Sequence, residues 1–261
     1  MVRDAQPEAQ PQTPPERLDI LYRDERLVVV DKPSGLLVHR SPIDRHETRF
    51  ALQILRDQLG QRVYTLHRLD KGTSGALAFA LDPATARQYM AAFARGEVDK
   101  TYVALVRGWP PTDGVVERAL SAVVDDRIAP QSSEPREART AFARIATFEL
   151  PLRVDRYPTS RYALVQLSPR TGRRHQLRRH LAGESHPIVG DSTYGKGRHN
   201  RLFRETFGLQ RLLLACTQLV FPAHEQRSAL RIDAPLAPEF AALLAQLRER
   251  YAADPFNPLS P

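Results

Sequence analysis

Hydrophobic and polar positions follow two different spacings along the chain, and these spacings predict both strands and helices. Alternating or continuous apolar runs predict strands over 27–32, 76–81, 100–108, 138–150 and 161–169, and the run over 36–40 resumes the first of them after the turn KPSG. Apolar positions at helical spacing predict helices over 50–60, 82–96 and 237–251, with a short one within 173–183. Gly60 and Gly96 stand where two of these helices should end.

The order of these elements favours an α+β fold. Strands outnumber helices and do not alternate strictly with them, so we expect a central, largely antiparallel mixed β-sheet flanked by helices and loops, and not a doubly wound parallel sheet. Two polar or basic segments, 125–137 and 195–208, interrupt the pattern. They are interpreted as surface insertions.

The ends of the chain differ in composition from its body. Residues 1–16 are rich in Pro, Gln and Glu and lack apolar periodicity, which predicts a disordered tail, and residues 253–261 are interpreted in the same way. The body over 17–252 is expected to form one domain. The sequence contains no export signal and no stretch of 18 uninterrupted apolar residues, so we expect no membrane span and a cytoplasmic location.

Charge adds information about partners. Lys and Arg number 38 against 30 Asp and Glu, which gives a formal net charge of +8. A basic protein favours polyanions such as nucleic acids, although charge alone is equally compatible with a protein that is simply kept soluble. The single cysteine, Cys216, excludes an internal disulfide framework and a cysteine zinc cluster, and its apolar surroundings predict a packed core residue.

The most basic segment is 170–180, which holds five Arg and two His in eleven residues. On a helix, Arg174 and Arg178 would share one face while the leucines of the segment pack inward. A solvated basic face is the commoner outcome for such a run. No acidic residue intervenes here, however, and contact with RNA or another phosphate is therefore favoured. The two histidines, five positions apart, do not have metal-ligand spacing, so no metal site is expected.

Five motifs occur in one order along the chain: DKPSGLLVHR, HRLDKGTSGALAFA, KTYVALVRG, SPRTGRRHQLRRH and HPIVGDSTYG. Together they resemble the RluA-type family of pseudouridine synthases. The resemblance implies the pseudouridine synthase fold for a catalytic domain over 17–252, with no room for an S4 RNA-binding domain. It also implies an isomerase that needs no metal or organic cofactor. The chain departs from the family pattern at Ala215, where a histidine is usual, and at Ala223 and His224.

Further segments, among them ILYRDERLVVVDKPSGLLVHRS, RYPTSRY and FGLQRL, resemble one tRNA-modifying member of that family. This implies that the substrate is uridine 65 in the T-arm stem of tRNA. Two alternatives remain open. The same chemistry could act on another uridine of tRNA or rRNA, or the chain could be a non-catalytic RNA-binding protein. No membrane partner and no obligate protein partner is expected.

The resemblance assigns three catalytic residues. Asp70, in HRLD, would attack C1′ of the uridine as a nucleophile or remove the C2′ proton as a base, and the sequence does not choose between these. Arg178 would pair with Asp70, because burial disfavours an isolated carboxylate and a guanidinium offsets that cost. Tyr102 would stack on the target base, and its hydroxyl could assist removal of the C5 proton.

Other residues are implied in binding the RNA. A uridine in a stem must be flipped out of the helix, and Arg68 would fill the space it leaves. Leu214 is a candidate for the apolar floor beneath the uracil, and Asp191 is expected only to support a turn. The remaining candidates for RNA contact are Arg173, Arg174, His175 and Arg179.

Overall fold

The computed structural model describes residues 16–40, 46–122, 134–223 and 228–253. Its strands are β1 (Asp19–Arg23), β2 (Leu27–Lys32), β3 (Tyr64–Thr65), β4 (Ser74–Ala80), β5 (Asp99–Arg107), β6 (Asp113–Glu117), β7 (Arg139–Leu150), β8 (Ser160–Pro169), β9 (Leu214–Phe221) and β10 (Leu230–Asp233). Its helices are α1 (Ala51–Leu59), α2 (Pro83–Arg95), α3 (Gln176–Gly183), α4 (Gly197–Phe207) and α5 (Pro238–Tyr251). None of the helices in these ranges is long and apolar enough to cross a membrane.

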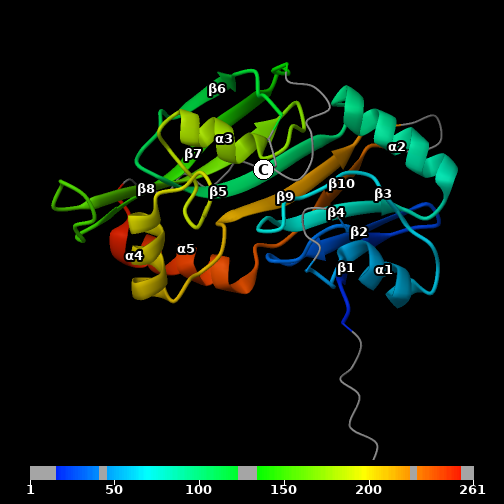
Figure 1. Ribbon diagram of the computed structural model, residues 1–261, viewed down its shortest axis with the longest axis horizontal. Helices are drawn as coiled ribbons and strands as arrows, with labels where there is room; N and C mark the ends of the chain where they lie inside the picture. The colour runs from blue at the N-terminus through cyan, green and yellow to red at the C-terminus, as the bar shows by residue number, and fades with distance from the viewer. Residues whose placement is uncertain (1–15, 41–45, 123–133, 224–227, 254–261) are drawn as a thin grey trace, which may run out of the picture.

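One sheet organises the fold (Figure 1). Its strands follow the order β1-β2-β4-β9-β5-β8-β7-β6, with β10 paired to β9 and β3 paired to β4. Strands β4 and β9 run parallel, whereas the other strand pairs are antiparallel. The predicted α+β fold around a largely antiparallel mixed sheet is confirmed. The structure described begins at residue 16 and ends at 253, so most of each predicted tail lies outside it.

Apolar side chains cover both faces of this sheet. Successive residues of a strand point to opposite faces, and on β5 the side chains of Tyr102 and Ala104 join one buried cluster while Val103 and Leu105 join the other. Helices α2 and α3 contribute to the first cluster, and α4 and α5 to the second. In Figure 1 the two pairs accordingly lie on opposite sides of the sheet. Tyr102 therefore faces the side that carries α3.

The structure corrects three expectations. Residues 36–40 do not form a strand, and only Leu37 forms an isolated bridge, to Phe50. The basic segment 195–208, interpreted as a surface insertion, instead contains α4, whose His199 and Phe203 are buried. Helix α3 begins at Gln176, so Arg174 lies before it and does not share a helical face with Arg178. Of the other predicted insertion, residues 123–133 lie outside the described ranges.

Candidate active site

Asp70 lies in the turn that connects β3 to β4. The backbone N–H of Thr73 donates to the carbonyl of Asp70 at 3.0 Å and closes the turn. A second turn packs against it: Gly35 N–H donates to Lys71 O at 2.8 Å, and Ser34 Oγ donates to Gly72 O at 2.7 Å. The two turns thus brace each other through one backbone hydrogen bond and one from the Ser34 side chain, across 38 positions of sequence in the latter case. This double turn fixes the position of Asp70.

Lys32, the last residue of β2, connects the same two turns from inside. Its side chain is fully buried, and its ammonium donates to the carbonyls of Pro33, Leu36 and Lys71 at 2.9, 2.7 and 3.3 Å. Burial lowers the pKa of Lys32 to about 7, against the opposing influence of the nearby Asp70 carboxylate. The lysine of the DKPSG motif is therefore a structural support of the Asp70 turn.

Gly75 allows β4 to approach β9 closely. Its φ is +106°, and a Cβ at this position would lie 2.0 Å from the carbonyl oxygen of Cys216, so no other residue fits without moving β9. Cys216 is also the cross-strand neighbour of Tyr102 on β5. The close approach of β4 therefore brings the Asp70 turn to the strand that carries Tyr102.

Tyr102 is buried, and this burial raises the pKa of its phenol well above the ordinary value, with smaller contributions from Cys216 and Asp70. The phenol stays protonated across the physiological range. On β9, directly across from Tyr102, burial raises the pKa of the Cys216 thiol to about 12. Both groups are therefore neutral beside the Asp70 turn.

Arg178 lies between two carboxylates. Its Nη1 is 3.3 Å from Asp70 Oδ2, while Nε and Nη2 donate to the two carboxylate oxygens of Asp191 at 2.7 and 2.9 Å. Burial alone would lower the pKa of Arg178, but the two carboxylates together raise it above its ordinary value. The planar guanidinium is thus oriented by a bidentate bond on one side and presents its remaining edge to Asp70.

Asp191 is fully buried and has four hydrogen-bond donors around it. Besides Arg178, the backbone N–H groups of Thr193 and Tyr194 donate to its Oδ1 at 2.9 and 3.0 Å. Burial by itself would raise the pKa of Asp191, but the hydrogen bonds from Arg178 and from Tyr194 outweigh it and hold the pKa below its usual value. The sequence reasoning placed this residue in a turn and missed its pairing with Arg178.

Two aromatic rings complete this cluster. The guanidinium of Arg178 lies 5.1 Å from the centre of the Tyr194 ring, and the Tyr194 hydroxyl is 3.0 Å from His175 Nδ1. His175 has a left-handed backbone, φ 55°, and its Nε2 is 4.0 Å from Asp70 Oδ2. The left-handed residue thus stands directly before α3, the helix that carries Arg178. Tyr194 was also missed, since tyrosine in the turn GDSTYG carries no distinct signal.

Asp70 stands between two hollows in the surface. The first, about 570 Å³ in volume, is also lined by Tyr102, Lys100, Leu214 and Phe93. The second, about 1200 Å³, extends from Asp70 toward Asp191 and α4. Both are lined by Arg68, Leu69, Asp70, Arg174, His175 and Arg178. The carboxylate side chain is 20% exposed, so a ligand can reach it from this junction.

The structure brings together all but one of the residues predicted to form the site. The first hollow is lined by Asp70, Tyr102, Arg178, Arg68, Arg173, Arg174, His175 and Leu214. Arg179 lies elsewhere, because its guanidinium donates to the carbonyl of Ser121 at 2.8 Å. Arg174 has a buried Nε without a hydrogen-bond partner among the described residues. Ala215, where the sequence departs from the family pattern, is buried in β9, and His224 lies outside the described ranges.

The described residues contain no group of three or more His, Cys, Asp or Glu side chains that could hold a metal ion. The chemistry available at the junction is therefore that of one accessible carboxylate, a guanidinium held beside it and an aromatic ring, inside a rim of arginines. Such a group can act as a nucleophile or as a base toward a ligand whose negative charge the arginines attract.

Replacing Asp191 by asparagine should destabilise the protein by about 3 kcal/mol at neutral pH, because Arg178 would then be a buried cation with one partner fewer. The pKa of Asp191 is lowered by folding, so its contribution is present above the unfolded value near 4 and is lost as the pH falls through the folded value. The difference between wild type and variant should therefore shrink in acid.

Urea unfolding of both proteins at neutral and at acidic pH measures this difference. Asp99→Asn is the matched control, since Asp99 pairs with Arg170 on the surface, where both side chains are more than half exposed, and should change the free energy of unfolding by less than about 1 kcal/mol. Equal effects of the two substitutions at neutral pH would refute the buried pairing.

Comparisons with known proteins show which sequences and folds this chain resembles. The family described as RNA pseudouridylate synthase matches residues 26–183, more than half of the chain. A "tRNA pseudouridine synthase C" of Vibrio parahaemolyticus is 50% identical over 210 residues, which cover 79% of this chain and 85% of the relative. The protein of the same name from Vibrio cholerae is 48% identical over 232 residues, which cover 88% and 95%.

Two solved structures share the fold. "Human RNA Pseudouridylate Synthase Domain Containing 4" superposes with a TM-score of 0.66 at 29% identity, covering 88% of this chain and 93% of that one. "Human RNA Pseudouridylate Synthase Domain Containing 1" superposes with a TM-score of 0.65 at 26% identity, covering 96% and 100%. The likeness extends over nearly the whole chain in both cases.

Proposed function

The chain belongs to the RNA pseudouridylate synthase family, and from this premise we propose that it converts uridine 65, in the T-arm stem of tRNA, into pseudouridine. The activity class follows from the family: it is an isomerase that makes pseudouridine from uridine in RNA, and the expected likeness to RluA-type synthases is confirmed. Relatives named for tRNA, at 43–50% identity, support tRNA as the substrate. Position 65 is supported by the sequence resemblance to the tRNA-modifying member.

The observation that carries this proposal is the accessible Asp70 carboxylate, held 3.3 Å from Arg178 at the mouth of the hollow that contains Tyr102. The reaction breaks the bond from N1 to C1′, turns the uracil and joins C5 to C1′. The C5 proton leaves and N1 gains a proton, so atoms and charge balance and nothing is oxidised. Asp70 either attacks C1′ and forms an ester that C5 displaces, or removes the C2′ proton so that uracil leaves and a glycal forms, to which C5 then adds while C2′ regains its proton.

Arg178 and Tyr102 have distinct parts in this proposal. Arg178 balances the charge of Asp70, and its bidentate bond to Asp191 keeps the guanidinium oriented while substrate enters. Tyr102 offers a flat ring for the uracil to stack on. Because burial raises the pKa of its phenol well above the usual value, the hydroxyl is protonated before substrate binds and can donate a hydrogen bond to the uracil.

The arginines of the rim suit a flipped nucleotide. Unstacking and unpairing a stem uridine costs a few kcal/mol. Arg68 is exposed at the mouth of both hollows and forms no ion pair within the described ranges, so it is free to fill the space the base leaves. Arg174, whose buried Nε lacks a partner, would gain one from a phosphate or a base. A tRNA substrate also fits the expected cytoplasmic location.

The direct test is tritium release from tRNA that carries uridine labelled at C5. We expect the protein to release one tritium per tRNA and to leave pseudouridine at position 65, while tRNA with cytidine at that position releases none from it. No release from tRNA would overturn the proposal. Mapping of pseudouridine in a deletion strain separates the alternatives, because a position lost from rRNA in place of tRNA would reassign the substrate.

A further inference from the structure

Helix α4 has two chemically different sides. His199 and Phe203 point into the protein and are buried, and Phe207 lies partly buried beside Tyr251 of α5. Arg198, Arg201 and Arg204 are exposed. The basic segment that the sequence analysis treated as an insertion is therefore an amphipathic helix whose exposed side carries three arginines and one acidic residue, Glu205.

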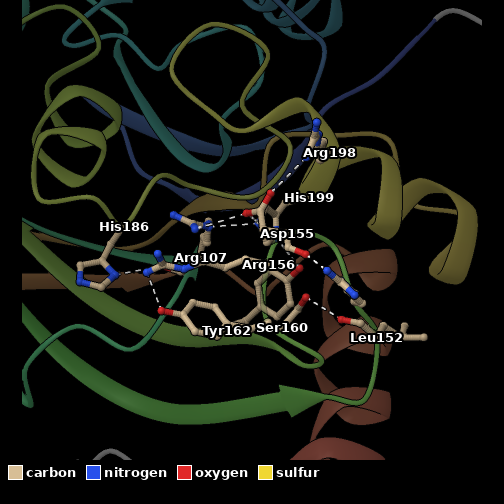
Figure 2. A network of polar contacts seen from close by, with 11 residues as sticks. Arg107, Leu152, Asp155, Arg156, Ser160, Tyr162, His186, Arg198 and His199 are labelled. Atoms are coloured by element: carbon tan, nitrogen blue, oxygen red, sulfur yellow. Dashed lines mark hydrogen bonds and ion pairs between the residues drawn. The ribbon is translucent and has the colours of Figure 1, made fainter.

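A polar network around the buried side chains of His199 and Tyr162 anchors the N-terminal half of α4 to the sheet (Figure 2). His199 Nδ1 is 2.7 Å from the hydroxyl of Tyr162 on β8, and His199 Nε2 is 3.1 Å from Asp155 Oδ2. Arg107 of β5 contacts both, at 3.1 Å to His199 Nε2 and 3.5 Å to Asp155 Oδ2. Arg198 also pairs with Asp155, with 3.7 Å between Arg198 Nη1 and Asp155 Oδ1. The helix therefore has a fixed orientation.

The next residue of α4 ties the helix to the active-site loop. The amide of Asn200 donates to the carbonyl of Asp191 at 2.9 Å and accepts from the N–H of Gly190 at 2.8 Å. Asp191 in turn holds Arg178, which reaches Asp70. A short chain of hydrogen bonds thus sets the distance between α4 and the reacting carboxylate.

Arg201 and Arg204 line the larger hollow, about 1200 Å³, whose wall also contains Asp70. The three acidic residues of that wall are already engaged: Asp70 and Asp191 with Arg178, and Glu239 with Arg211. Arg201 and Arg204 form no ion pair with any residue in the described part of the chain. The hollow therefore has unbalanced positive charge on its α4 side, next to the site where the uridine reacts.

We propose that Arg201 and Arg204 bind the phosphates of the RNA strand on one side of the target uridine, so that α4 is a docking helix for the substrate. This rests on the proposed function and specifies how that substrate is held. Residues three apart on a helix have Cβ atoms about 5–6 Å apart and face the same way. The guanidinium groups of Arg201 and Arg204 can therefore bind phosphates of the same RNA strand, each through two parallel hydrogen bonds.

The test compares wild type with the double variant Arg201→Gln/Arg204→Gln. Each lost phosphate contact should reduce the slope of log affinity against log salt by about one unit, so we expect a slope smaller by about two and an affinity for tRNA about tenfold weaker. Turnover at saturating tRNA should stay within about twofold of wild type, because neither arginine touches the reacting atoms. Lysine at both positions should restore the slope, but only part of the affinity.

Arg87→Gln is the matched control, since Arg87 is exposed on α2, lines neither hollow, and changes charge by the same amount per residue. An affinity and salt slope of the double variant equal to those of this control would overturn the inference, as would a fall in turnover at saturating tRNA with affinity unchanged. Tritium release by the wild type tests the proposed function separately from the proposed role of α4. If the wild type modifies tRNA and the double variant binds tRNA normally, only the role of α4 in binding is refuted. If wild type releases no tritium, the proposed function fails and the docking helix with it.

Discussion

Asp70→Asn is expected to abolish tritium release from tRNA, with a fall of at least about 10⁴-fold in kcat. The substitution keeps the shape of the side chain and removes only its charge and its power to attack C1′ or accept the C2′ proton. The side chain is partly exposed, and Arg178 keeps its bidentate bond to Asp191, so the fold should be retained. Affinity for tRNA should stay within a few-fold of wild type.

Single-turnover tritium release and a binding assay on the same preparation measure these two quantities. Asp57→Asn serves as the control, because Asp57 is an exposed carboxylate on α1 that pairs with its neighbour Arg56 and lines neither hollow. This control should keep wild-type activity. Activity in Asp70→Asn within tenfold of wild type would mean that another group performs the chemistry.

The second large effect is expected at Arg178. Arg178→Lys keeps the positive charge but replaces a planar fork with a single ammonium, which cannot bind both oxygens of Asp191 and also reach Asp70 in the same geometry. We expect kcat to fall by at least about 100-fold, since a misplacement of about 1 Å at a reacting group has that effect. Arg178→Met would in addition leave the fully buried Asp191 unpaired and destabilise the fold by about 3–5 kcal/mol.

Thermal unfolding and tritium release on both variants distinguish orientation from stability. The lysine variant should lose much activity and little stability, whereas the methionine variant should lose both. Arg56→Lys, at an exposed ion pair on α1, is the control and should change neither. Wild-type kcat in the lysine variant would show that the orientation of the guanidinium does not matter for the reaction.

The sequence predicted the strongly patterned elements well. Helix α2 has its boundary signals in the chain itself: Asp82 accepts the N–H groups of Ala84 and Thr85, Pro83 occupies the first turn, and Gly96 ends the helix in a left-handed conformation. Strand β4 is buried along its whole length, which agrees with the continuous apolar run that predicted a strand over 76–81.

The sequence analysis did not predict β1, β3, β6 and β10, nor β9 in the middle of the sheet. Strands β1, β6 and β10 are short and mostly exposed or half-buried, so their apolar alternation is weak and their pairing depends on partners elsewhere in the chain. Helix α4 was missed for a related reason: its buried His199 and Phe203 are interspersed with arginines, and the polar network that receives His199 comes from β5, β8 and residue 155. No local pattern contains that information.

For the site too, some features could be predicted from the sequence and others could not. Asp70, Tyr102 and Arg178 were predicted from the family motifs, and the fold brings all three to one hollow although they lie on three different elements. The bond from Arg178 to Asp191 could not be predicted, because it depends on how the loop after α3 folds back. The expected shared face of Arg174 and Arg178 failed because the left-handed His175 delays the start of α3.

The most direct measurement is a crystal structure of the Asp70→Asn variant with tRNA bound, since an inactive variant would hold the intact substrate. The target uridine should be out of the T-arm stem, with its uracil against the Tyr102 ring, the C1′ and C2′ atoms of its ribose facing residue 70, and flanking phosphates near Arg201 and Arg204. A uridine still stacked in its helix in the bound complex, or a ribose that faces away from residue 70, would contradict the account.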